Sequence, residues 1–597
     1  MRAALIPHPQ EAVRIVRLRV LRKASQLHVG QEALTMSADR EDGWKAFKPA
    51  EKCGIIGIAG RADVAPNLYY GLRILQHRGQ ESAGIVVFNG EMKARRGMGL
   101  VHEVFSRGDL EDISGNAGIG HVRYSTTGSS VIENAQPITC QSSIGDVALA
   151  HNGDIVNATD LRTELQKKGW AFMSSSDSEV IVRLLANEIA RTGDVERALK
   201  EFTSVLVGAY SLVLLIKDTV YAIRDPLAVR PLCVGEVDGS YVVASESVVF
   251  DTLGGKFIRD LKPGEIVRLR PDGFDSIRIP HPTHTAHCMF EWVYFARPDS
   301  VLDGRLVYDA RVRIGQELAR EHPVEADIVV PVPESGRAQA QGYSRVCALP
   351  VVEGLIKNRY IERTFIMPEQ TDREVSVLLK LNPIKSAVKG KRVILVDDSI
   401  VRGTTIKKIV GILKDAGARE VHLRIGCPPI RAPCYLGIDM KTRDQFIAND
   451  RTVEEVRDFV GAESLGYLSL RGLIKALSHP REDLCLGCLT GEYPIEVPGE
   501  KVRGVQRLEM FTDETGRAPK TAAKRTRERA HMERNGPLVD ARGSVGPIAA
   551  ASGGASEPTS PPKTKKSARG SSARGTMRSH AAKGINRGPQ YRPPSGR

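Results

Sequence analysis

Three segments place nucleophilic, acidic or hydroxyl side chains beside glycines, a pattern that suits chemistry on small polar substrates. Cys53 precedes the apolar run GIIGIAG, Lys391–Thr405 reads KRVILVDDSIVRGTT, and Cys485-Leu-Gly-Cys488 forms a CxxC pair. Each also has an ordinary structural reading. A lone thiol is usually a small buried hydrophobe, an Asp often sits in a strand–turn–helix, and a CxxC pair can serve zinc, redox chemistry or neither. The sequence around each segment decides between these readings.

The segment Lys391–Thr405 has the composition of a loop that holds a phosphorylated sugar. An apolar strand ends in Asp397 and Asp398, and a loop rich in hydroxyls and glycine then leads into a helix. Backbone N–H groups at a helix N-terminus bind phosphate, and Gly403 permits close backbone approach. Carboxylates at the end of a strand can hold ribose hydroxyls or Mg²⁺. The hydroxyl donors are Ser399, Thr404 and Thr405.

This string resembles the 5-phosphoribosyl 1-diphosphate (PRPP) site of type I phosphoribosyltransferases, and VDDSIVRGTT resembles the glutamine-dependent amidophosphoribosyltransferases in particular. PVPESG (Pro331–Gly336) is similar to the diphosphate-binding loop of that family, and LIKNRYIERTFI (Leu355–Ile366) to the stretch before its closing loop. The resemblance implies one Mg²⁺ ion per subunit. The implied metal positions are Ser335, Asp397 and Asp398, and the implied PRPP cradle is Ser399, Arg402, Gly403, Thr404 and Thr405.

The closing loop departs from the family pattern. The family generally has V-R-x-K-L, whereas this chain has Val377-Leu378-Leu379-Lys380-Leu381. Since an arginine at position 378 would meet phosphates, we expect leucine there to weaken PRPP binding or loop closure. The departure leaves one alternative function open, that of a catalytically weakened paralogue acting as a nucleotide-responsive regulatory protein.

Four segments downstream of Cys53 change the reading of that thiol. They are LQHRGQESAG (Leu75–Gly84), GHVRYSTTG (Gly120–Gly128), AHNGD (Ala150–Asp154) and SSDSE (Ser175–Glu179). Together they resemble, in order and spacing, a class II glutaminase with an N-terminal nucleophile. Such a thiolate attacks the glutamine amide, giving an oxyanion and then a thioester. The expected base is the α-amino group of Cys53 itself, whose ordinary pKa near 8 suits proton transfer, so residues 1–52 should be removed.

The same resemblance assigns roles to further residues. Asn152 and Gly153 would form the oxyanion hole, a side-chain amide and a backbone N–H directed at the developing charge. Arg123 and Asp177 would grip the α-carboxylate and α-ammonium groups of glutamine. Arg78 is also placed at the glutamine site.

Cys288 in HCMFEWVYFARPDS and Cys434 in PPIRAPCYLGID complete a set of four cysteines with Cys485 and Cys488. These contexts resemble the four ligand positions of the iron–sulfur branch of the amidophosphoribosyltransferases. Four thiolates suit a [4Fe–4S] cluster, and zinc in a Cys₄ site is the main alternative. We expect the cluster to be structural and to join the domains, because the reaction needs no electron.

Charge is concentrated at the ends of the chain. Of the net charge of +14, the segment 515–597 carries 18 Lys+Arg against 4 Asp+Glu, so nucleic-acid binding by the body is not indicated. This tail has one aromatic residue, and such a composition cannot bury enough apolar surface to fold. We expect a disordered, solvated basic tail, with a nucleic-acid partner disfavoured.

The first 35 residues are basic and apolar, as in an organelle transit peptide. An upstream extension, or a true start at Met36, is the favoured interpretation. The longest uncharged apolar stretch, Phe202–Ile216, has 15 residues and is too short for a membrane span. Nine scattered cysteines fit a reducing compartment. We therefore expect a cytoplasmic protein, with organelle import by residues 1–35 as a minor alternative.

Two blocks with different patterns follow the extension. Residues 53–285 show short apolar runs between Gly-rich turns and two helical segments, Tyr69–Gln76 and Ser178–Ala190. Residues 325–425 alternate strands and helices, and Val393–Val396 is apolar on both faces, like a central parallel strand. With the resemblance, the fold predicted is an αββα glutaminase sandwich at 53–285. It is followed at 286–514 by a type I phosphoribosyltransferase α/β domain with a C-terminal cluster-binding segment.

The resemblance as a whole implies an enzyme that converts glutamine, PRPP and water into 5-phosphoribosylamine, diphosphate and glutamate, the first step of de novo purine (IMP) biosynthesis. Family members are homotetramers or dimers inhibited by purine nucleotides, and we expect the same here. Another class II amidotransferase, such as glucosamine-phosphate synthase or asparagine synthetase, would share the Cys53 block. It would lack VDDSIVRGTT.

Overall fold

The computed structural model describes residues 53–124, 129–358, 381–440 and 442–497. The extension 1–52, position Leu378 and the tail 515–597 lie outside the described residues. In the ranges that are described, no helix is long and apolar enough to cross a membrane.

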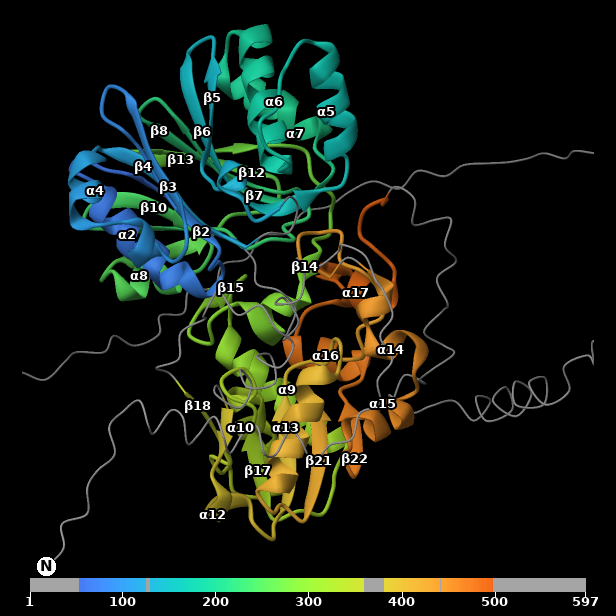
Figure 1. Cartoon of the computed structure of the whole chain (residues 1–597). Coiled ribbons are helices and arrows are strands. Elements are labelled where there is room, and N and C mark those ends of the chain that lie inside the picture. Colours follow the sequence, from blue (N-terminus) through green and yellow to red (C-terminus); the bar gives the residue numbers. More distant parts are fainter. Residues whose placement is uncertain (1–52, 125–128, 359–380, 441, 498–597) are drawn as a thin grey trace, which may run out of the picture. The chain divides into compact units, whose positions relative to one another are not determined.

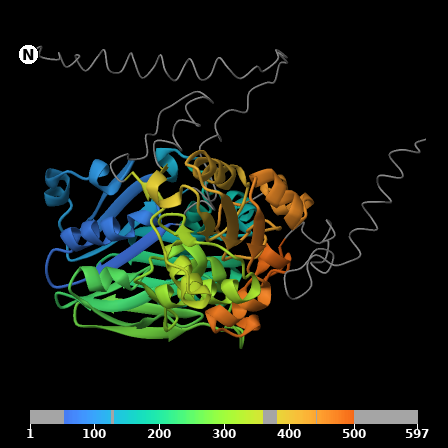
Figure 2. The same cartoon turned by 90° about the horizontal axis from the view of Figure 1, so that it is seen from below.

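The first block folds as two antiparallel sheets (Figures 1 and 2, blue to green). Within the described residues, one sheet has seven strands in the order β11-β9-β10-β1-β4-β2-β3 and the other six in the order β13-β12-β8-β7-β6-β5. The first sheet comprises β1 (Gly54–Ala59), β2 (Ser82–Phe88), β3 (Met92–Met98), β4 (Ala117–Arg123), β9 (Cys233–Val237), β10 (Ser240–Ala244) and β11 (Lys256–Asp260). The second comprises β5 (Ile138–Ser142), β6 (Gly145–Ile155), β7 (Gly208–Ile216), β8 (Thr219–Arg224), β12 (Glu265–Arg270) and β13 (Gly273–Arg278).

Side chains from both sheets meet in one buried layer. Ile55 and Ile119 from the first sheet pack with Val213 and Leu215 from the second. Helices cover the outer faces, because the opposite side chains of the same strands are also apolar and need cover. α2 (Ala65–Ile74), α3 (Val101–Val104) and α8 (Val248–Thr252) pack on the first sheet, and α6 (Asp177–Thr192) packs on the second with α5 (Ala158–Lys167) and α7 (Val195–Val205) beside it. The predicted αββα sandwich is confirmed.

The second block is built on a parallel sheet, ordered β17-β20-β21-β22 in the part of the chain that the structure describes. Its strands are β17 (Ile328–Pro331), β20 (Arg392–Asp397), β21 (Glu420–Ile425) and β22 (Ser464–Tyr467). Val393 and Leu395 of β20 face one apolar cluster, whereas Ile394 and Val396 face another. The central parallel strand predicted from Val393–Val396 is therefore confirmed, with both faces covered.

Helices lie on both faces of this sheet. α9 (Val307–Glu321), α10 (Arg337–Cys347) and α16 (Leu470–Leu477) contribute to one cluster, and α13 (Thr404–Asp415) and α15 (Val453–Val460) to the other. Three short strand pairs complete the block: β14 (His287–Cys288) with β23 (Leu484–Cys485), β15 (Val301–Leu302) with β16 (Arg305–Leu306), and β18 (Leu355–Lys357) with β19 (Leu381–Pro383). Further short α-helices are α12 (Lys385–Val388), α14 (Ile447–Asp450) and α17 (Gly487–Thr490) in this block and α4 (Arg107–Asp112) in the first block.

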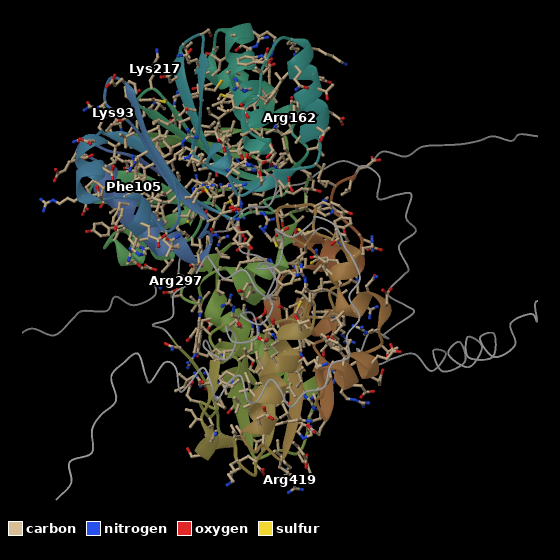
Figure 3. The ribbon with its side chains drawn as sticks, viewed as in Figure 1. Lys93, Phe105, Arg162, Lys217, Arg297 and Arg419 are labelled. Carbon is tan, nitrogen blue, oxygen red and sulfur yellow. The ribbon has the colours of Figure 1, made fainter. Side chains whose placement is uncertain are left out.

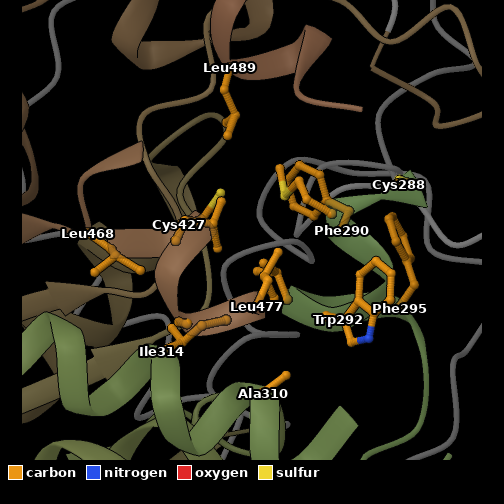
Figure 4. Packing of buried hydrophobic residues seen from close by; sticks show 14 of the residues in the cluster. Cys288, Phe290, Trp292, Phe295, Ala310, Ile314, Cys427, Leu468, Leu477 and Leu489 are labelled. Atoms are coloured by element: carbon orange, nitrogen blue, oxygen red, sulfur yellow. The ribbon is translucent and has the colours of Figure 1, made fainter. Parts of the chain in front are cut away.

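Several charged side chains lie at the periphery. Lys93, Lys217 and Arg419 are exposed at strand edges and turns (Figure 3). The larger apolar cluster of the second block is lined instead by aromatic and aliphatic side chains, including Phe290, Trp292 and Leu477 (Figure 4).

Gly57 sets how closely the two sheets of the sandwich approach. A Cβ at this position would lie 2.5 Å from Val213 Cγ1 and 2.9 Å from Val220 Cγ1 of the facing sheet. We predict that Gly57→Ala lowers the free energy of unfolding by about 1–3 kcal/mol, because overpacking forces side chains out of their rotamers. Urea denaturation measures this. Gly273→Ala is the control, since a Cβ there meets nothing within 4 Å. Equal stability of the two variants would contradict the prediction.

Candidate functional site

Cys53 lies directly before β1, which pairs with β10 on one side and β4 on the other. Its thiol is buried and donates to the backbone oxygen of Tyr124 at 3.5 Å. A small pocket opens beside it. The lining residues are Cys53, Arg123, Tyr124, Gln136, His151, Gly153, Ser176, Asp177 and Ser178.

The thiol stands in surroundings that disfavour its charged form. Burial raises the pKa of Cys53 to about 11, although the Tyr124 carbonyl bond and the charge of Arg123 act in the opposite direction. Since the thiolate is the nucleophile, the protein needs a base near the sulfur at neutral pH.

Asn152 and Gly153 follow one another in β6, opposite Ser211 and Tyr210 of β7. The side-chain nitrogen Nδ2 of Asn152 is buried and has no hydrogen-bond partner among the described residues. Gly153 has a φ of 155°, and a Cβ there would lie 1.9 Å from the oxygen of Ala209. A buried amide donor beside a position that only glycine fits is the arrangement required for binding an oxyanion.

Arg123 and Asp177 line the same pocket from the end of β4 and the first turn of α6. Arg123 Nη1 lies 3.3 Å from a carboxylate oxygen of Glu81. Asp177 accepts a hydrogen bond from the backbone N–H of Ile155 at 3.3 Å. Although burial raises the pKa of Asp177, the neighbouring His151 holds it below the usual value. The structure thus brings a guanidinium and a carboxylate together beside the thiol.

Arg78 lies outside this pocket lining. Its guanidinium is buried and contacts the backbone oxygen of Cys53 and the carboxylates of Glu246 and Glu291. These contacts indicate that Arg78 supports the main chain of Cys53. A direct contact of Arg78 with glutamine remains a prediction.

The predicted phosphosugar loops meet at one edge of the parallel sheet. β17 and β20 are neighbours in register, with Pro331 opposite Val396. The loop that carries Ser335 follows β17, and the pair Asp397–Asp398 ends β20. A Cβ at Gly336 would lie 2.4 Å from the oxygen of Val396, so the Ser335 loop is in close contact with the end of β20. The carboxyl ends of parallel strands are where α/β sheets bind ligands.

The second of these loops leads into the N-terminus of α13. Gly403 caps this helix with a φ of 75°, and a Cβ there would lie 2.4 Å from Ile447 Cδ1. Asp398 is buried and accepts a hydrogen bond from Ser399 Oγ at 2.6 Å. Arg402 donates to Gln445 Oε1 at 2.7 Å. Thr404 and Thr405 open the helix, and N–H groups at a helix N-terminus attract phosphate.

A cavity of about 560 Å³ lies beside the Ser335 loop. Its lining includes Glu334, which precedes Ser335, and Lys357 and Asn358 from the segment that leads toward the closing loop. The rest of the lining is Arg337, Glu353, Ile356 and Asn382. The rest of the closing loop is outside the described residues.

Four cysteines that are far apart in the sequence come together in the second block. Cys288 and Cys485 are direct partners in the parallel pair β14–β23. The backbone oxygen of Cys488 accepts from the N–H groups of Arg431 and Ala432, which holds the Cys434 loop beside it. Figure 4 shows Cys288 at the margin of the apolar cluster. The structure therefore brings the four predicted cluster ligands together.

The four thiols interact electrostatically. Burial, followed by the charges of Cys288 and Cys434, raises the pKa of Cys485 to about 12. Burial and the other thiols also raise the pKa of Cys488 well above its usual value. Across the described ranges, no three His, Cys, Asp or Glu side chains are arranged to hold a single metal ion.

Comparison with known proteins decides the family. A family model described as a glutamine amidotransferase domain matches residues 121–252, and one described as a phosphoribosyl transferase domain matches 299–428. The chain is 52% identical over 455 residues to the amidophosphoribosyltransferase of Methanothermobacter thermautotrophicus, covering 75% of this chain and 96% of the relative. The Bacillus subtilis amidophosphoribosyltransferase is 44% identical over 455 residues, covering 75% and 95%. The chain belongs to the amidophosphoribosyltransferase family.

Solved structures agree with this assignment. The Bacillus subtilis glutamine PRPP amidotransferase complexed with ADP and GMP has a TM-score of 0.70 at 44% identity, covering 74% of this chain and 98% of that one. An allosteric regulatory enzyme of purine biosynthesis has a TM-score of 0.71 at 43% identity, covering 74% and 97%. The predicted function is confirmed: the chain is an amidophosphoribosyltransferase of purine biosynthesis, with glutamine amidotransferase and phosphoribosyltransferase domains. The match of the phosphoribosyl transferase model excludes the other class II amidotransferases considered.

Sequence reasoning missed several residues around the nucleophile. Gln136, His151 and Ser178 line the pocket and are joined by hydrogen bonds of 2.8–3.1 Å. Glu246 and Glu291 hold Arg78. The sequence offered one signal for Glu291, since this acid stands alone in the apolar run MFEWVYF. An acid in such a run is expected to be buried, and a buried charge needs a partner.

The raised pKa of Cys53 makes a prediction about pH. In the chain that retains residues 1–52, alkylation of Cys53 by iodoacetamide should accelerate about tenfold per pH unit from pH 7 to 9, since the neutral thiol predominates below its pKa. After removal of residues 1–52, the profile should bend near pH 8, where an α-amino group titrates. Mass spectrometry of the modified peptide measures the rates. A plateau at or below pH 8 in the unprocessed chain would contradict the account.

Proposed function

We propose that Cys53, once residues 1–52 are removed, is the nucleophile of glutamine hydrolysis, with its own α-amino group as base. The α-amino group takes the thiol proton and the sulfur attacks the amide carbon. The oxyanion is stabilised by Asn152 Nδ2 and the N–H of Gly153. Ammonia leaves with a proton returned by the amino group, and water cleaves the thioester to give glutamate.

Arg123 and Asp177 orient the substrate for that attack. The guanidinium pairs with the α-carboxylate of glutamine, and the carboxylate with its α-ammonium group. The observation that carries this proposal is the shared pocket, in which both charged groups lie beside the thiol of Cys53.

The second half-reaction is assigned to the loops after β17 and β20. Ammonia attacks C1 of PRPP and the C1–O bond to diphosphate breaks. The N-terminus of α13, with Ser399, Arg402, Gly403, Thr404 and Thr405, holds the 5-phosphate. Ser335, Asp397 and Asp398 are the residues that would hold Mg²⁺, which neutralises the leaving diphosphate when it is bound. Two carboxylates and a hydroxyl fit this ion, because Mg²⁺ keeps water and phosphate oxygens as its other ligands.

We also propose that Cys288, Cys434, Cys485 and Cys488 hold a [4Fe–4S] cluster. The raised pKa values of Cys485 and Cys488, caused by burial and by the neighbouring thiols, mean that these thiolates need cations to be stable. Zinc in a Cys₄ site is the main alternative, and the sequence contexts of Cys288 and Cys434 support the cluster. When bound, it would tie β14 to the C-terminal segment, a structural role.

Other properties follow from the family as proposals. Purine nucleotides are proposed as inhibitors, supported by the Bacillus subtilis relative complexed with ADP and GMP. A homotetramer or dimer and a cytoplasmic location are carried over as expectations. The extensive identity to amidophosphoribosyltransferases supports the active enzyme over the weakened paralogue.

Separating the two nitrogen sources tests the division of labour. We predict that Cys53→Ala loses 5-phosphoribosylamine formation from glutamine but retains formation from ammonia within about twofold, because free ammonia needs no thiol to reach C1 of PRPP. Asp397→Asn should impair both activities. The measurement is diphosphate release with either nitrogen donor. Glutamine-dependent turnover in Cys53→Ala would reject the nucleophile assignment.

The cluster makes an optical prediction. Anaerobically purified protein should absorb at about 400 nm, as iron–sulfur proteins with cysteine ligands do, and Cys485→Ser should lose this band and its iron. Cys347→Ser is the control, because Cys347 lies outside the quartet. A colourless protein with stoichiometric zinc would overturn the assignment.

A further inference from the structure

Glu291 is a buried carboxylate that lies between two buried arginines. It begins the π-helical turn Glu291–Phe295, three residues after Cys288. Both of its oxygens accept hydrogen bonds from Nη2 of Arg78, each at 3.0 Å. Nη1 of Arg230 lies 3.8 Å from the same carboxylate. Burying a carboxylate costs free energy unless it is paired with a positive charge. The two arginines therefore fix the position of the Glu291 carboxylate.

Arg78 links the Glu291 carboxylate to Cys53, the proposed nucleophile. Its Nε donates to the backbone oxygen of Cys53 at 3.3 Å, and its Nη1 pairs with Glu246. Glu246 in turn accepts hydrogen bonds from Ser300 Oγ at 2.6 Å and from the N–H of Arg297 at 3.0 Å. The guanidinium is therefore held by two carboxylates while its remaining edge holds the main chain of Cys53.

The main chain of Cys53 needs such support. The ladder between β1 and β4 begins at Gly54, so Cys53 lies just outside the regular pairing of the sheet. Cys53 carries the thiol and, after processing, the base. A hydrogen bond on its carbonyl oxygen limits rotation of the main chain and keeps both groups directed at the substrate.

The positive charges of Arg78 and Arg230 explain why a carboxylate stands at position 291. Burial lowers the pKa of Arg78, but the carboxylates of Glu291 and Glu246 raise this pKa above its usual value. The guanidinium therefore stays charged. The three side-chain nitrogens of Arg230 have no hydrogen-bond partner within the described ranges, and its ion pair is with Glu291. Removing this carboxylate would leave two buried cations facing each other without their shared anion.

We propose that Glu291 is a positioning residue for glutamine hydrolysis, which acts from the second block by holding Arg78 against the carbonyl oxygen of Cys53. This inference rests on the proposed function of Cys53. It assigns a role in the glutaminase reaction to the segment that follows Cys288 of the cysteine quartet.

The experiment compares Glu291→Gln with Glu265→Gln in the full chain, processed and purified anaerobically. Glu265 is a buried glutamate that pairs through both oxygens with Arg259, at 2.7 and 2.8 Å, and does not line the Cys53 pocket. For each variant, kcat and KM are measured for glutamine, and turnover is measured with ammonia. Ammonia-dependent turnover reports whether the second block is folded.

We expect Glu291→Gln to lower kcat with glutamine by about 10- to 100-fold, as misplacement of reacting groups does. The KM for glutamine and the ammonia-dependent rate should change by less than about threefold, because Arg123 and Asp177 are untouched. Glu265→Gln should leave the ratio of the two activities unchanged. Alkylation of Cys53 by a glutamine analogue with an electrophilic carbon should slow in step with kcat.

Several results would overturn the inference. Equal loss of glutamine-dependent and ammonia-dependent turnover would mean that Glu291 has only a structural role. An increase in the KM for glutamine alone would indicate that Arg78 binds glutamine. An unchanged kcat would exclude positioning altogether. Failure of the wild-type chain to use glutamine, or retention of that use in Cys53→Ala, would instead refute the proposed function.

Discussion

The desolvation of the Cys53 thiol is the constraint on which the amide chemistry depends. A pocket small enough to exclude water strengthens the contacts that grip glutamine and stabilise an oxyanion, but it also raises the thiol pKa to about 11. The structure leaves deprotonation to a group that must lie beside the sulfur. An α-amino group on the same residue would meet this requirement, and the proposed mechanism therefore links activity to removal of residues 1–52.

The phosphoribosyl site solves a different electrostatic problem. PRPP brings several negative charges, and in the proposed site these meet a helix N-terminus, hydroxyls and two buried aspartates suited to a cation. These groups lie at the carboxyl ends of β17 and β20, where neighbouring parallel strands place their loops side by side. Arg78, Glu246 and Glu291 form a buried charge network that joins the first block to the second, with Arg78 and Glu291 separated by 213 residues in the chain.

The sequence predicted the parts of this architecture that depend on local pattern. The apolar residues Val393–Val396 predicted a central strand, and the hydroxyl-rich loop predicted the start of the helix α13. Cys53, Asn152 and Asp177 could be placed from motif order, and the structure brings Cys53 and Asp177 into one pocket. Glu246 and Glu291 could not be placed, because a buried carboxylate is explained only by its partner. That partner, Arg78, is 168 and 213 residues away, respectively. Long-range pairing of this kind leaves no periodicity in the chain.

Anaerobic measurement of glutamate release from glutamine, with and without PRPP and Mg²⁺, tests the central claim most directly. If one chain carries both sites and couples them, release should rise strongly with PRPP, match diphosphate release one to one, and vanish in Cys53→Ala. Glutamate release that is indifferent to PRPP would contradict the account, because it would describe a glutaminase whose transfer site is not engaged.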